Sequence, residues 1–395
     1  MEGALHGVKI IDLSRVLAGP FSTMILGDLG AEVFKIESVS SGDDTRGWGP
    51  PFVEGESAYY LCSNRNKQAM TLNLKCEKGK EILEKLVSRA DVVVENFKPG
   101  TLDRMGLGYE HLKQVKKDII VASISGFGKS GPYAHLPGYD YIIQAMSGLM
   151  SITGKEESEP TKVGVAISDV LTGLFTCIGI LAALQHRNRT GEGQEIDISL
   201  FDSQLAALVN VASNYLCSGN IPKRLGNQHP NIVPYQVFST IDGELVVAVG
   251  NDDQFRKFAY LLGKEELSTS DRFQTNAQRL KNKDELIPII QEVMKTKSKQ
   301  EWKHLLDEAG IPNGPINDVK EALETEQAKA RDMVVSINHP TISELKLVGS
   351  PIKLSKTPVQ IKKHPPLHGE HTKEILAGLG YLEEEIMKMK QNQTI

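Results

Sequence analysis

The stretch VKIIDLSRVLAGPFSTMILGDLGAEVFKIE, residues 8–37, decides the fold class. It begins with an apolar strand, passes through a helical segment at 19–30 and ends in a second apolar strand at 31–37. Strands that are apolar on both faces and are joined by helices are typical of parallel βαβ units. Strands and helices continue to alternate at 69–75, 78–90, 91–97, 117–125 and 194–216. The sequence therefore predicts an α/β fold with a doubly wound parallel sheet.

The chain changes character near residue 218. A length of 395 residues favours two domains. Residues 219–234 are rich in Gly, Pro and Asn, and 235–250 read as a hairpin that turns at Asp242–Gly243. We therefore expect a large domain over 1–224, a smaller α+β domain over 225–325, and a return to the large domain over 326–395, which ends in a helix.

Composition limits the partners and the compartment. The net charge of −5 comes from interspersed signs, which argues against a nucleic-acid-binding protein. The apolar run at 170–184 spans about 22 Å as a helix, so we expect a core helix and no membrane span. The sequence shows no signal or transit peptide, as in a mature form cut from a precursor. Cys62, Cys76, Cys177 and Cys217 are widely spaced, so we expect neither a zinc site nor disulfides, and a reducing compartment.

Gly126, Gly128 and Gly131 match the spacing of a dinucleotide-binding motif, but their context does not. That motif needs a helix that opens directly from the glycines, and here Pro132 follows at once. Glu37, which resembles the acid that holds a cofactor ribose, precedes the glycines instead of following them. We therefore expect an ordered loop at this point and no NAD site.

Asp169 stands at the head of the apolar run 170–184, which should be buried on most sides. An aspartate at a helix start often caps the first N–H groups. A carboxylate beside an apolar segment is also costly to bury, and such groups are often functional. The local sequence favours capping and leaves the functional interpretation open.

Several segments spread over nearly the whole chain resemble the class III CoA-transferases, the formyl-CoA and carnitine type. They are RVLAGPFSTMILGDLGAEVFKIE (15–37), GDDTRGWGPP (42–51), NRNKQAMTLNLK (64–75), VVVENFKPGTLDRMGLGYE (92–110), SISGFGKSGPYAHLPGYDYIIQAMSGLMSITG (123–154), AISD (166–169) and GEHTKEIL (369–376). The resemblance implies a Rossmann-like large domain built from both chain ends, a smaller domain between them, and two chains that interlock as a homodimer.

The resemblance also implies a reaction. Asp169 occupies the position of the family's nucleophile, which forms first an anhydride and then an aspartyl-CoA thioester. The helix start is expected to keep Asp169 ionised, and nearby N–H groups to stabilise the oxyanions. The nearest branch of the family is mitochondrial and moves CoA from succinyl-CoA to a dicarboxylic acid, glutarate or 3-hydroxy-3-methylglutarate. We accordingly expect a location in the mitochondrial matrix, with the cytoplasm as the alternative, and no metal or permanently bound cofactor.

Matching the family pattern suggests the residues that bind the substrates. CoA is expected to contact Lys75, Asn96, Phe97, Arg104 and the backbone from Val16 to Ala18. Ser38 stands where the formyl-CoA branch has Arg, so Arg46 is a candidate for the missing phosphate contact. Arg46 and Arg65 are also candidates for the distal carboxylate of the acid. Tyr139 is a further candidate, and His229 either touches the acid or caps a turn.

Two other functions remain open at this point. The 2-methylacyl-CoA racemases share the fold and use a His in a Gly-His-Asp motif, where this chain has Tyr139. A tyrosine, with an ordinary pKa of ~10, is a poor base near neutral pH. A protein that binds CoA without catalysis is expected to lack the aspartate, and Asp169 is present.

Overall fold

The computed structural model describes residues 2–395 and divides into two compact units. The larger unit comprises the chain up to Leu149, Lys162–Asn220 and Glu326–Ile395. The smaller unit comprises Met150–Thr161 and Ile221–Thr325. The sequence analysis assigned 150–161 to the large domain, and the structure corrects this assignment, because that segment joins the smaller unit.

A six-stranded parallel sheet forms the centre of the larger unit, in the order β5-β2-β1-β6-β7-β8. This order confirms the predicted doubly wound α/β class. The strands are β1 (Lys9–Asp12), β2 (Glu32–Glu37), β5 (Lys67–Thr71), β6 (Val92–Glu95), β7 (Ile120–Ser125) and β8 (Glu195–Ser199).

The strand order reverses between β1 and β6. After β1 the chain moves outward to β2 and β5, and it then returns to place β6 on the other side of β1. Ligands of open α/β sheets bind in the crevice beyond the carboxyl ends of the strands at such a reversal. The segments that leave β1 and β6 are therefore the first place to look for a site.

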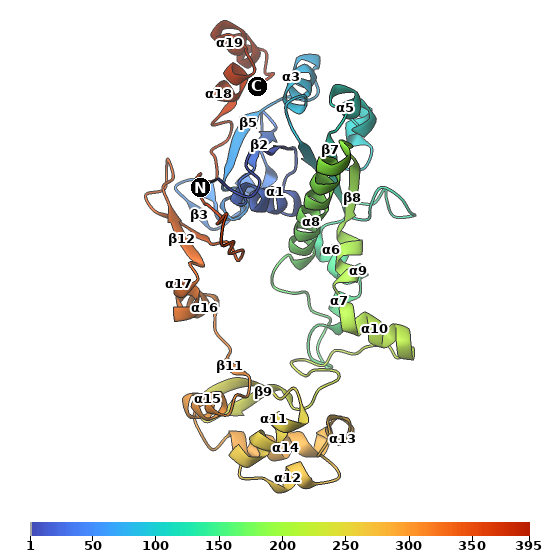
Figure 1. Ribbon diagram of the computed structural model, residues 1–395, viewed down its shortest axis with the longest axis vertical. Helices are drawn as coiled ribbons and strands as arrows, with labels where there is room; N and C mark the ends of the chain where they lie inside the picture. Colours follow the sequence, from blue (N-terminus) through green and yellow to red (C-terminus); the bar gives the residue numbers. More distant parts are fainter. Residues whose placement is uncertain (1) are drawn as a thin grey trace. The chain divides into compact units, whose positions relative to one another are not determined.

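Helices cover both faces of this sheet (Figure 1). Alternate strand residues point to opposite faces, so that Ile10 joins one core and Ile11 the other. One face packs against α1 (Ala18–Asp28) and α8 (Ile167–Thr190). The other face packs against α3 (Glu77–Val87), α5 (Tyr109–Val115), α18 (Thr372–Gly378) and α19 (Glu383–Gln391).

The chain's C-terminal segment is tied directly to the edge of the sheet. The backbone N–H of His371 donates to Ala69 O over 2.9 Å, and the N–H of Thr71 donates to Thr372 Oγ1 over 3.1 Å. Leu376, in α18, is fully buried in the same core as Ile11. The last helices thus complete one face of a sheet whose strands come from the first half of the chain.

α8 is longer and less buried than the sequence suggested. It packs on α1, β7 and β8, but four large apolar side chains on another side are exposed: Leu174, Phe175, Ile178 and Leu181. The expectation that this helix is buried on most sides is therefore wrong for the single chain. Among the helices of the described residues, α8 alone is long and apolar enough to cross a membrane, judged by length and composition only.

The remaining elements of the larger unit are short, and two predicted helices are each divided in two. The helix expected after β8 breaks into α9 and α10, and the terminal helix breaks at Gly380 into α18 and α19. The further elements are η1 (Asp44–Gly47), β3 (Phe52–Val53), β4 (Glu56–Ser57), α2 (Ala58–Leu61), α4 (Thr101–Arg104), α6 (Asp140–Met146), α9 (Leu200–Ala206), α10 (Val209–Ser218), α17 (Glu326–Ala330), β12 (Val334–Ile337) and β13 (Leu345–Val348). α7 (Leu149–Ile152) begins in the larger unit at Leu149 and continues into the smaller one.

The smaller unit is an α+β structure around a three-stranded antiparallel sheet, β11-β10-β9. The predicted hairpin is present, but Thr240 pairs with Gly243, so its loop residues are Ile241 and Asp242. Its core contains Phe238, Phe255, Phe258 and Trp302. Its elements are β9 (Tyr235–Thr240), β10 (Gly243–Ala248), β11 (Asn313–Pro315), α11 (Asp252–Leu261), α12 (Glu266–Thr269), α13 (Asn276–Lys281), α14 (Lys283–Met294), α15 (Lys299–Glu308) and α16 (Val319–Glu324).

Candidate active site

The loop from β1 to α1 lies at the reversal of strand order. Within it Val16 adopts φ +70°, a left-handed conformation that is unfavourable for a β-branched residue. α1 begins at Ala18, with Leu17 as its N-cap. Among the described residues, none accepts a hydrogen bond from the N–H of Leu17 or Ala18. The loop therefore presents two unpaired donors at the positive end of a helix.

Asp169 lies beside this loop. It is partly buried and lines a cavity of about 140 Å³. The cavity is bounded by Arg15, Val16, Leu17, Ala18, Asn96, Phe97, Lys98, Pro99, Ile124, Ser125, Gly126, Leu136, Pro137, Gly138, Tyr139 and Leu200. The structure thus brings Asp169 together with five residues that the sequence analysis had selected: Val16, Ala18, Asn96, Phe97 and Tyr139.

Asp169 does not cap its helix, contrary to what the local sequence favours. The N-cap of α8 is Ala166, which has no side-chain capping bond. The capping acceptor is Asp140 from α6, whose Oδ1 accepts from the N–H of Ser168 over 2.8 Å. No described group donates a hydrogen bond to the Asp169 carboxylate. Its side chain is therefore free to act on a ligand.

The pKa of Asp169 also departs from expectation. Burial, followed by the nearby negative charge of Asp140, raises it from 3.8 to about 7. The position at the start of α8 therefore does not keep the pKa of Asp169 low, contrary to the prediction that the helix start keeps this carboxylate ionised. The charge on Asp169 in turn contributes, after burial, to raising the pKa of Tyr59 to about 12, which places Tyr59 near the carboxylate.

A network of polar side chains fixes the backbone around Asp169. Asp140 Oδ2 accepts from Gln144 Nε2 over 2.7 Å, and Gln144 Oε1 accepts from the N–H of Val163 over 2.9 Å. Ser168 Oγ donates to Gln204 Oε1 over 2.9 Å. Sequence analysis missed Asp140 and Gln144, although both lie in the quoted segment 123–154, because it offered no sign that they turn toward α8.

Two glycines let the walls of the small cavity approach each other. A Cβ on Gly126 would lie 2.6 Å from the Cα of Gly138, and a Cβ on Gly138 would lie 2.5 Å from the Cα of Gly126. Glycine is therefore required at both positions by close backbone contact. Among the described residues, no helix begins within the glycine segment, since α6 starts only at Asp140. This agrees with the predicted ordered loop.

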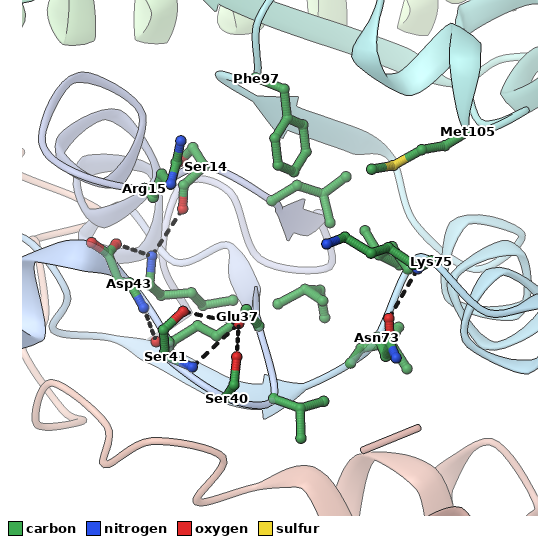
Figure 2. Close-up of a pocket in the computed structure, with 18 of the residues that line it drawn as sticks. Ser14, Arg15, Glu37, Ser40, Ser41, Asp43, Asn73, Lys75, Phe97 and Met105 are labelled. Atoms are coloured by element: carbon green, nitrogen blue, oxygen red, sulfur yellow. Dashed lines mark hydrogen bonds and ion pairs between the residues drawn. The ribbon is translucent and has the colours of Figure 1, made fainter. Parts of the chain in front are cut away.

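A larger cavity of about 690 Å³ adjoins the small one, and Arg15 and Phe97 line both. Figure 2 shows Lys75, Phe97 and Met105 on one side of it, with Arg15, Asp43 and Ser41 on the other. Ser38 also lines it. Arg104 lines neither cavity and is exposed, with Nη2 donating to Thr101 Oγ1 over 2.9 Å. The cavity offers apolar and cationic surface to a long ligand.

Fully buried charges lie beneath the loop that follows β1. Lys35 Nζ donates to Ser14 O over 3.0 Å and to Asp43 Oδ2 over 2.8 Å. Lys67 Nζ contacts Asp12 Oδ2 over 3.1 Å and Pro20 O over 2.9 Å, which ties the start of α1 to the sheet. Burial lowers the pKa of Lys67 to about 8, although Asp12 partly opposes this shift. Such pairs fix geometry more than they stabilise the fold.

The two arginines proposed as substrate ligands are held by structural contacts. Arg46 makes a bidentate ion pair with Glu37, through bonds of 2.8 and 2.7 Å, and Nη2 also donates to Tyr60 Oη over 2.6 Å. It lines neither cavity. Arg65 is buried and pairs in the same way with Asp28. Both expectations are corrected, because these guanidinium groups are already occupied by carboxylates.

The other two acceptor candidates differ in position. Tyr139 is 66% exposed and lines the small cavity with Asp169. His229 belongs to the smaller unit, where its Nδ1 accepts from the N–H of Asn231 over 3.0 Å and its ring lies 5.1 Å from that of Tyr235. These contacts match the turn-capping interpretation of His229.

Metal ligands and disulfides are not found in the described chain. Residues 2–395 contain no group of three or more His, Cys, Asp or Glu side chains that could hold a metal ion. The four cysteines are free. The described groups around the small cavity are the Asp169 carboxylate, backbone N–H groups and the cationic side chains of Arg15 and Lys98.

Comparisons with known proteins agree with this geometry. The family model described as "CoA-transferase family III" matches residues 5–372. The chain is 46% identical to succinyl-CoA:glutarate CoA-transferase of Mus musculus, over 94% of this chain and 85% of that protein. It is 44% identical to succinate–glutarate CoA-transferase of Agrobacterium fabrum, over 96% of each.

Solved structures give the same result. The crystal structure of a CAIB/BAIF family protein from Brucella suis superposes with a TM-score of 0.85 at 45% identity, and the match covers 96% of this chain and 100% of that one. The family match in sequence and the match to a solved structure therefore agree, and both extend over most of the chain. The chain therefore belongs to CoA-transferase family III.

Proposed function

We propose that this protein transfers CoA from succinyl-CoA to a dicarboxylic acid, glutarate first and 3-hydroxy-3-methylglutarate second, with Asp169 as the nucleophile. The observation that carries the proposal is the position of Asp169. It is an unpaired carboxylate in a small cavity, next to free backbone donors, and this cavity shares Arg15 and Phe97 with a larger one. The relatives named for succinyl-CoA and glutarate support the choice of substrates.

The reaction proceeds by two exchanges through Asp169. Its carboxylate attacks the thioester carbonyl of succinyl-CoA, which gives a succinyl–aspartyl anhydride and CoA thiolate. The thiolate then attacks the aspartyl carbonyl, which gives an enzyme–CoA thioester and releases succinate. Glutarate attacks this thioester to give a glutaryl–aspartyl anhydride and thiolate. The thiolate attacks the glutaryl carbonyl, which releases glutaryl-CoA and restores the carboxylate.

The raised pKa of Asp169 suits the first step. At about 7 it leaves roughly half of the carboxylate ionised at neutral pH. A carboxylate of higher pKa is also more basic, and therefore a better nucleophile toward a thioester once it is ionised. Because no described group donates a hydrogen bond to it, no such bond has to break before it attacks.

Each step passes through a tetrahedral oxyanion that needs hydrogen-bond donors. The N–H groups of Leu17 and Ala18 are unpaired and lie at the start of α1, beside the cavity that contains Asp169. Fixed donors of this kind typically lower such a barrier by ~3–4 kcal/mol each. We assign the oxyanion-stabilising role to this loop.

We assign CoA to the larger cavity. Lys75 is available there for a phosphate and Phe97 for apolar contact, and Val16 and Ala18 border the reacting end. Arg104 lies on α4 beside Met105, which lines the cavity, and can reach the outer phosphates from the surface. Tyr139 lines the small cavity and is the candidate contact for the acyl group.

We also propose that the protein is a homodimer. The exposed apolar side of α8 supports this, because monomeric proteins rarely leave a contiguous apolar patch open to water. Its proposed ligands are small molecules, and we propose no nucleic-acid or membrane partner. The net charge of −5 supports the absence of a nucleic-acid partner. A location in the mitochondrial matrix, with the cytoplasm as the alternative, stays a prediction.

The test is chromatography of acyl-CoAs after mixing the protein with succinyl-CoA and a panel of acids: glutarate, 3-hydroxy-3-methylglutarate, oxalate and carnitine. We expect a new glutaryl-CoA peak with wild type and none with Asp169→Ala. Asp202→Asn, which removes an exposed carboxylate from α9, is the matched control and should retain activity. Absence of any new acyl-CoA from folded protein would refute the proposal, and deuterium exchange into a 2-methylacyl-CoA would then test racemization.

Oxygen-18 tests the covalent route separately. In the proposed sequence, one oxygen of Asp169 leaves with succinate and is replaced by one from glutarate. A single turnover with ¹⁸O-glutarate should therefore place one labelled oxygen in the peptide that contains Asp169 and release unlabelled succinate. Labelled succinate in the first turnover would instead mean that the acid attacks succinyl-CoA directly.

A further inference from the structure

The peptide between Arg15 and Val16 is held at both of its polar atoms by side chains from two other segments, Asn96 just after β6 and Asp43 at the start of η1. Its carbonyl, Arg15 O, accepts from Asn96 Nδ2 over 2.6 Å. Its N–H, on Val16, donates to Asp43 Oδ1 over 3.2 Å. Asn96 makes a second contact with the same residue, because its Oδ1 accepts from the N–H of Arg15 over 2.9 Å. Both functional atoms of the Asn96 amide are thus used on Arg15.

This peptide plane sets the strained torsion of Val16. The angle φ describes rotation about the N–Cα bond, so it depends on how the preceding peptide is turned. At φ +70° the Cβ of a β-branched residue is crowded, and a turn of the peptide relieves the crowding. A turn of this kind would pull Arg15 O away from Asn96 and the Val16 N–H away from Asp43. The two side chains therefore hold Val16 in a conformation that it would otherwise leave.

The partners of the peptide are themselves fixed. Asp43 Oδ1 also accepts from the N–H of Thr45 over 3.0 Å, and Oδ2 accepts from the buried Lys35 over 2.8 Å. Burial opposes ionisation of Asp43, but Lys35 and Thr45 together hold its pKa at about 2. Asn96 follows directly after β6, next to β1 in the sheet. Asn96 and Asp43, which together we call the clamp, are thus anchored beside the central sheet.

We propose that Asn96 is a positioning residue, which holds the Arg15–Val16 peptide so that the next two N–H groups, of Leu17 and Ala18, point into the cavity that contains Asp169. This inference rests on the proposed function, since those two groups are the proposed oxyanion donors. It replaces the role that the family resemblance implied for Asn96, a contact with CoA. A positioning role changes the rate of the chemical step, whereas a CoA contact changes the affinity for acyl-CoA.

Val16 provides the specific test, because glycine adopts φ +70° without strain. Asn96→Ala should lower kcat by tenfold or more while KM for succinyl-CoA stays within about twofold. Adding Val16→Gly should recover about tenfold of the lost kcat. A factor of this size is expected because glycine removes the strain of one left-handed residue. Adding Val16→Ala is the matched control: it removes the same branch point but keeps the Cβ, and it should recover little.

Two kinetic outcomes would overturn the proposal. An increase in KM for succinyl-CoA with kcat unchanged in Asn96→Ala would make Asn96 a CoA ligand. Equal effects of Val16→Gly and Val16→Ala in the Asn96→Ala background would show that backbone strain is not what Asn96 opposes. A double-mutant cycle gives the coupling between the two sites directly.

Hydrogen exchange separates failure of this inference from failure of the proposed function. Mass spectrometry of a peptide that contains residues 15 and 16, whose N–H groups donate to Asn96 and Asp43, should show faster amide exchange in Asn96→Ala, and slower exchange at residue 16 again when Val16→Gly is added. If the wild type makes no acyl-CoA but this pattern holds, the proposed function fails and the clamp stands. If the wild type is active and exchange is the same in all variants, the clamp fails and the proposed function stands.

Discussion

Replacing Asp169 by asparagine should abolish CoA transfer and at the same time stabilise the protein at alkaline pH. The pKa of Asp169 rises from 3.8 in the unfolded chain to about 7 in the folded one, through burial and the charge of Asp140. Between these two values the folded state keeps a proton that the unfolded state has released, so stability falls as pH rises through this window. An asparagine side chain at this position cannot ionise, and the variant escapes this penalty.

The size of the effect follows from the shift. About three pKa units correspond to about 4 kcal/mol of unfolding free energy once the pH exceeds the folded value. At pH 5 only the first part of the window has been crossed, and the penalty is about 1.6 kcal/mol. The stability gained by Asp169→Asn should therefore be larger at pH 8 than at pH 5 by roughly 2–3 kcal/mol.

Urea unfolding followed by circular dichroism, at pH 5 and pH 8, measures this difference. Glu110→Gln is the matched control, because it neutralises an exposed acid in the first turn of another helix, α5. The free energy of unfolding of Glu110→Gln should differ little from that of wild type, and by nearly the same amount at both pH values. Two results would refute this reasoning: Asp169→Asn is less stable than wild type at pH 8, or it is stabilised equally at both pH values. Either result would mean that burial and Asp140 do not raise the pKa of Asp169 as described.

Three further predictions concern activity and assembly. The kcat/KM for succinyl-CoA should rise about tenfold from pH 6 to pH 8 with a midpoint near 7, and Asp140→Asn should move the midpoint lower; a flat profile would contradict this. Gly126→Ala should lower kcat/KM at least ~10-fold, because its Cβ would lie 2.6 Å from Gly138 Cα, whereas Gly378→Ala, with open space around it, should not. Ile178→Glu should shift the dimer toward monomer in light scattering, because this side chain is 60% exposed on the apolar side of α8; an unchanged dimer would place the interface elsewhere.

The sequence predicted the layers of the fold well and the directions of side chains poorly. Alternating apolar strands and helices between residues 8 and 125 were enough to predict a parallel sheet with helices on both faces. Strand order and the break at Ala207–Leu208 between α9 and α10 depend on packing between distant segments, which periodicity does not report. The apolar run after Asp169 was expected to be buried on most sides, because hydropathy does not distinguish a helix inside the core from a helix with an exposed apolar side.

In the candidate site, too, the sequence identified a key residue but not the contacts that determine its properties. Asp169 was found from its pattern and its family context, but its pKa depends on Asp140, which reaches α8 from a separate helix. Arg46 looked like a free cation, and only the fold reveals that Glu37 and Tyr60 occupy it. Asn96 was assigned to CoA because the sequence gives its neighbours along the chain and says nothing about the peptide that its amide faces.

The order in which the sheet is covered has a consequence for synthesis on the ribosome. The strands that carry Ile11, Ile36 and Met70 emerge early, whereas α18 and α19, which cover that face, emerge last. A nascent chain halted before Thr372 would leave this apolar face open to water and to other chains. Premature stop codons just before Thr372 should therefore produce aggregation-prone protein bound by chaperones, even though every strand of the central sheet and Asp169 have already been made.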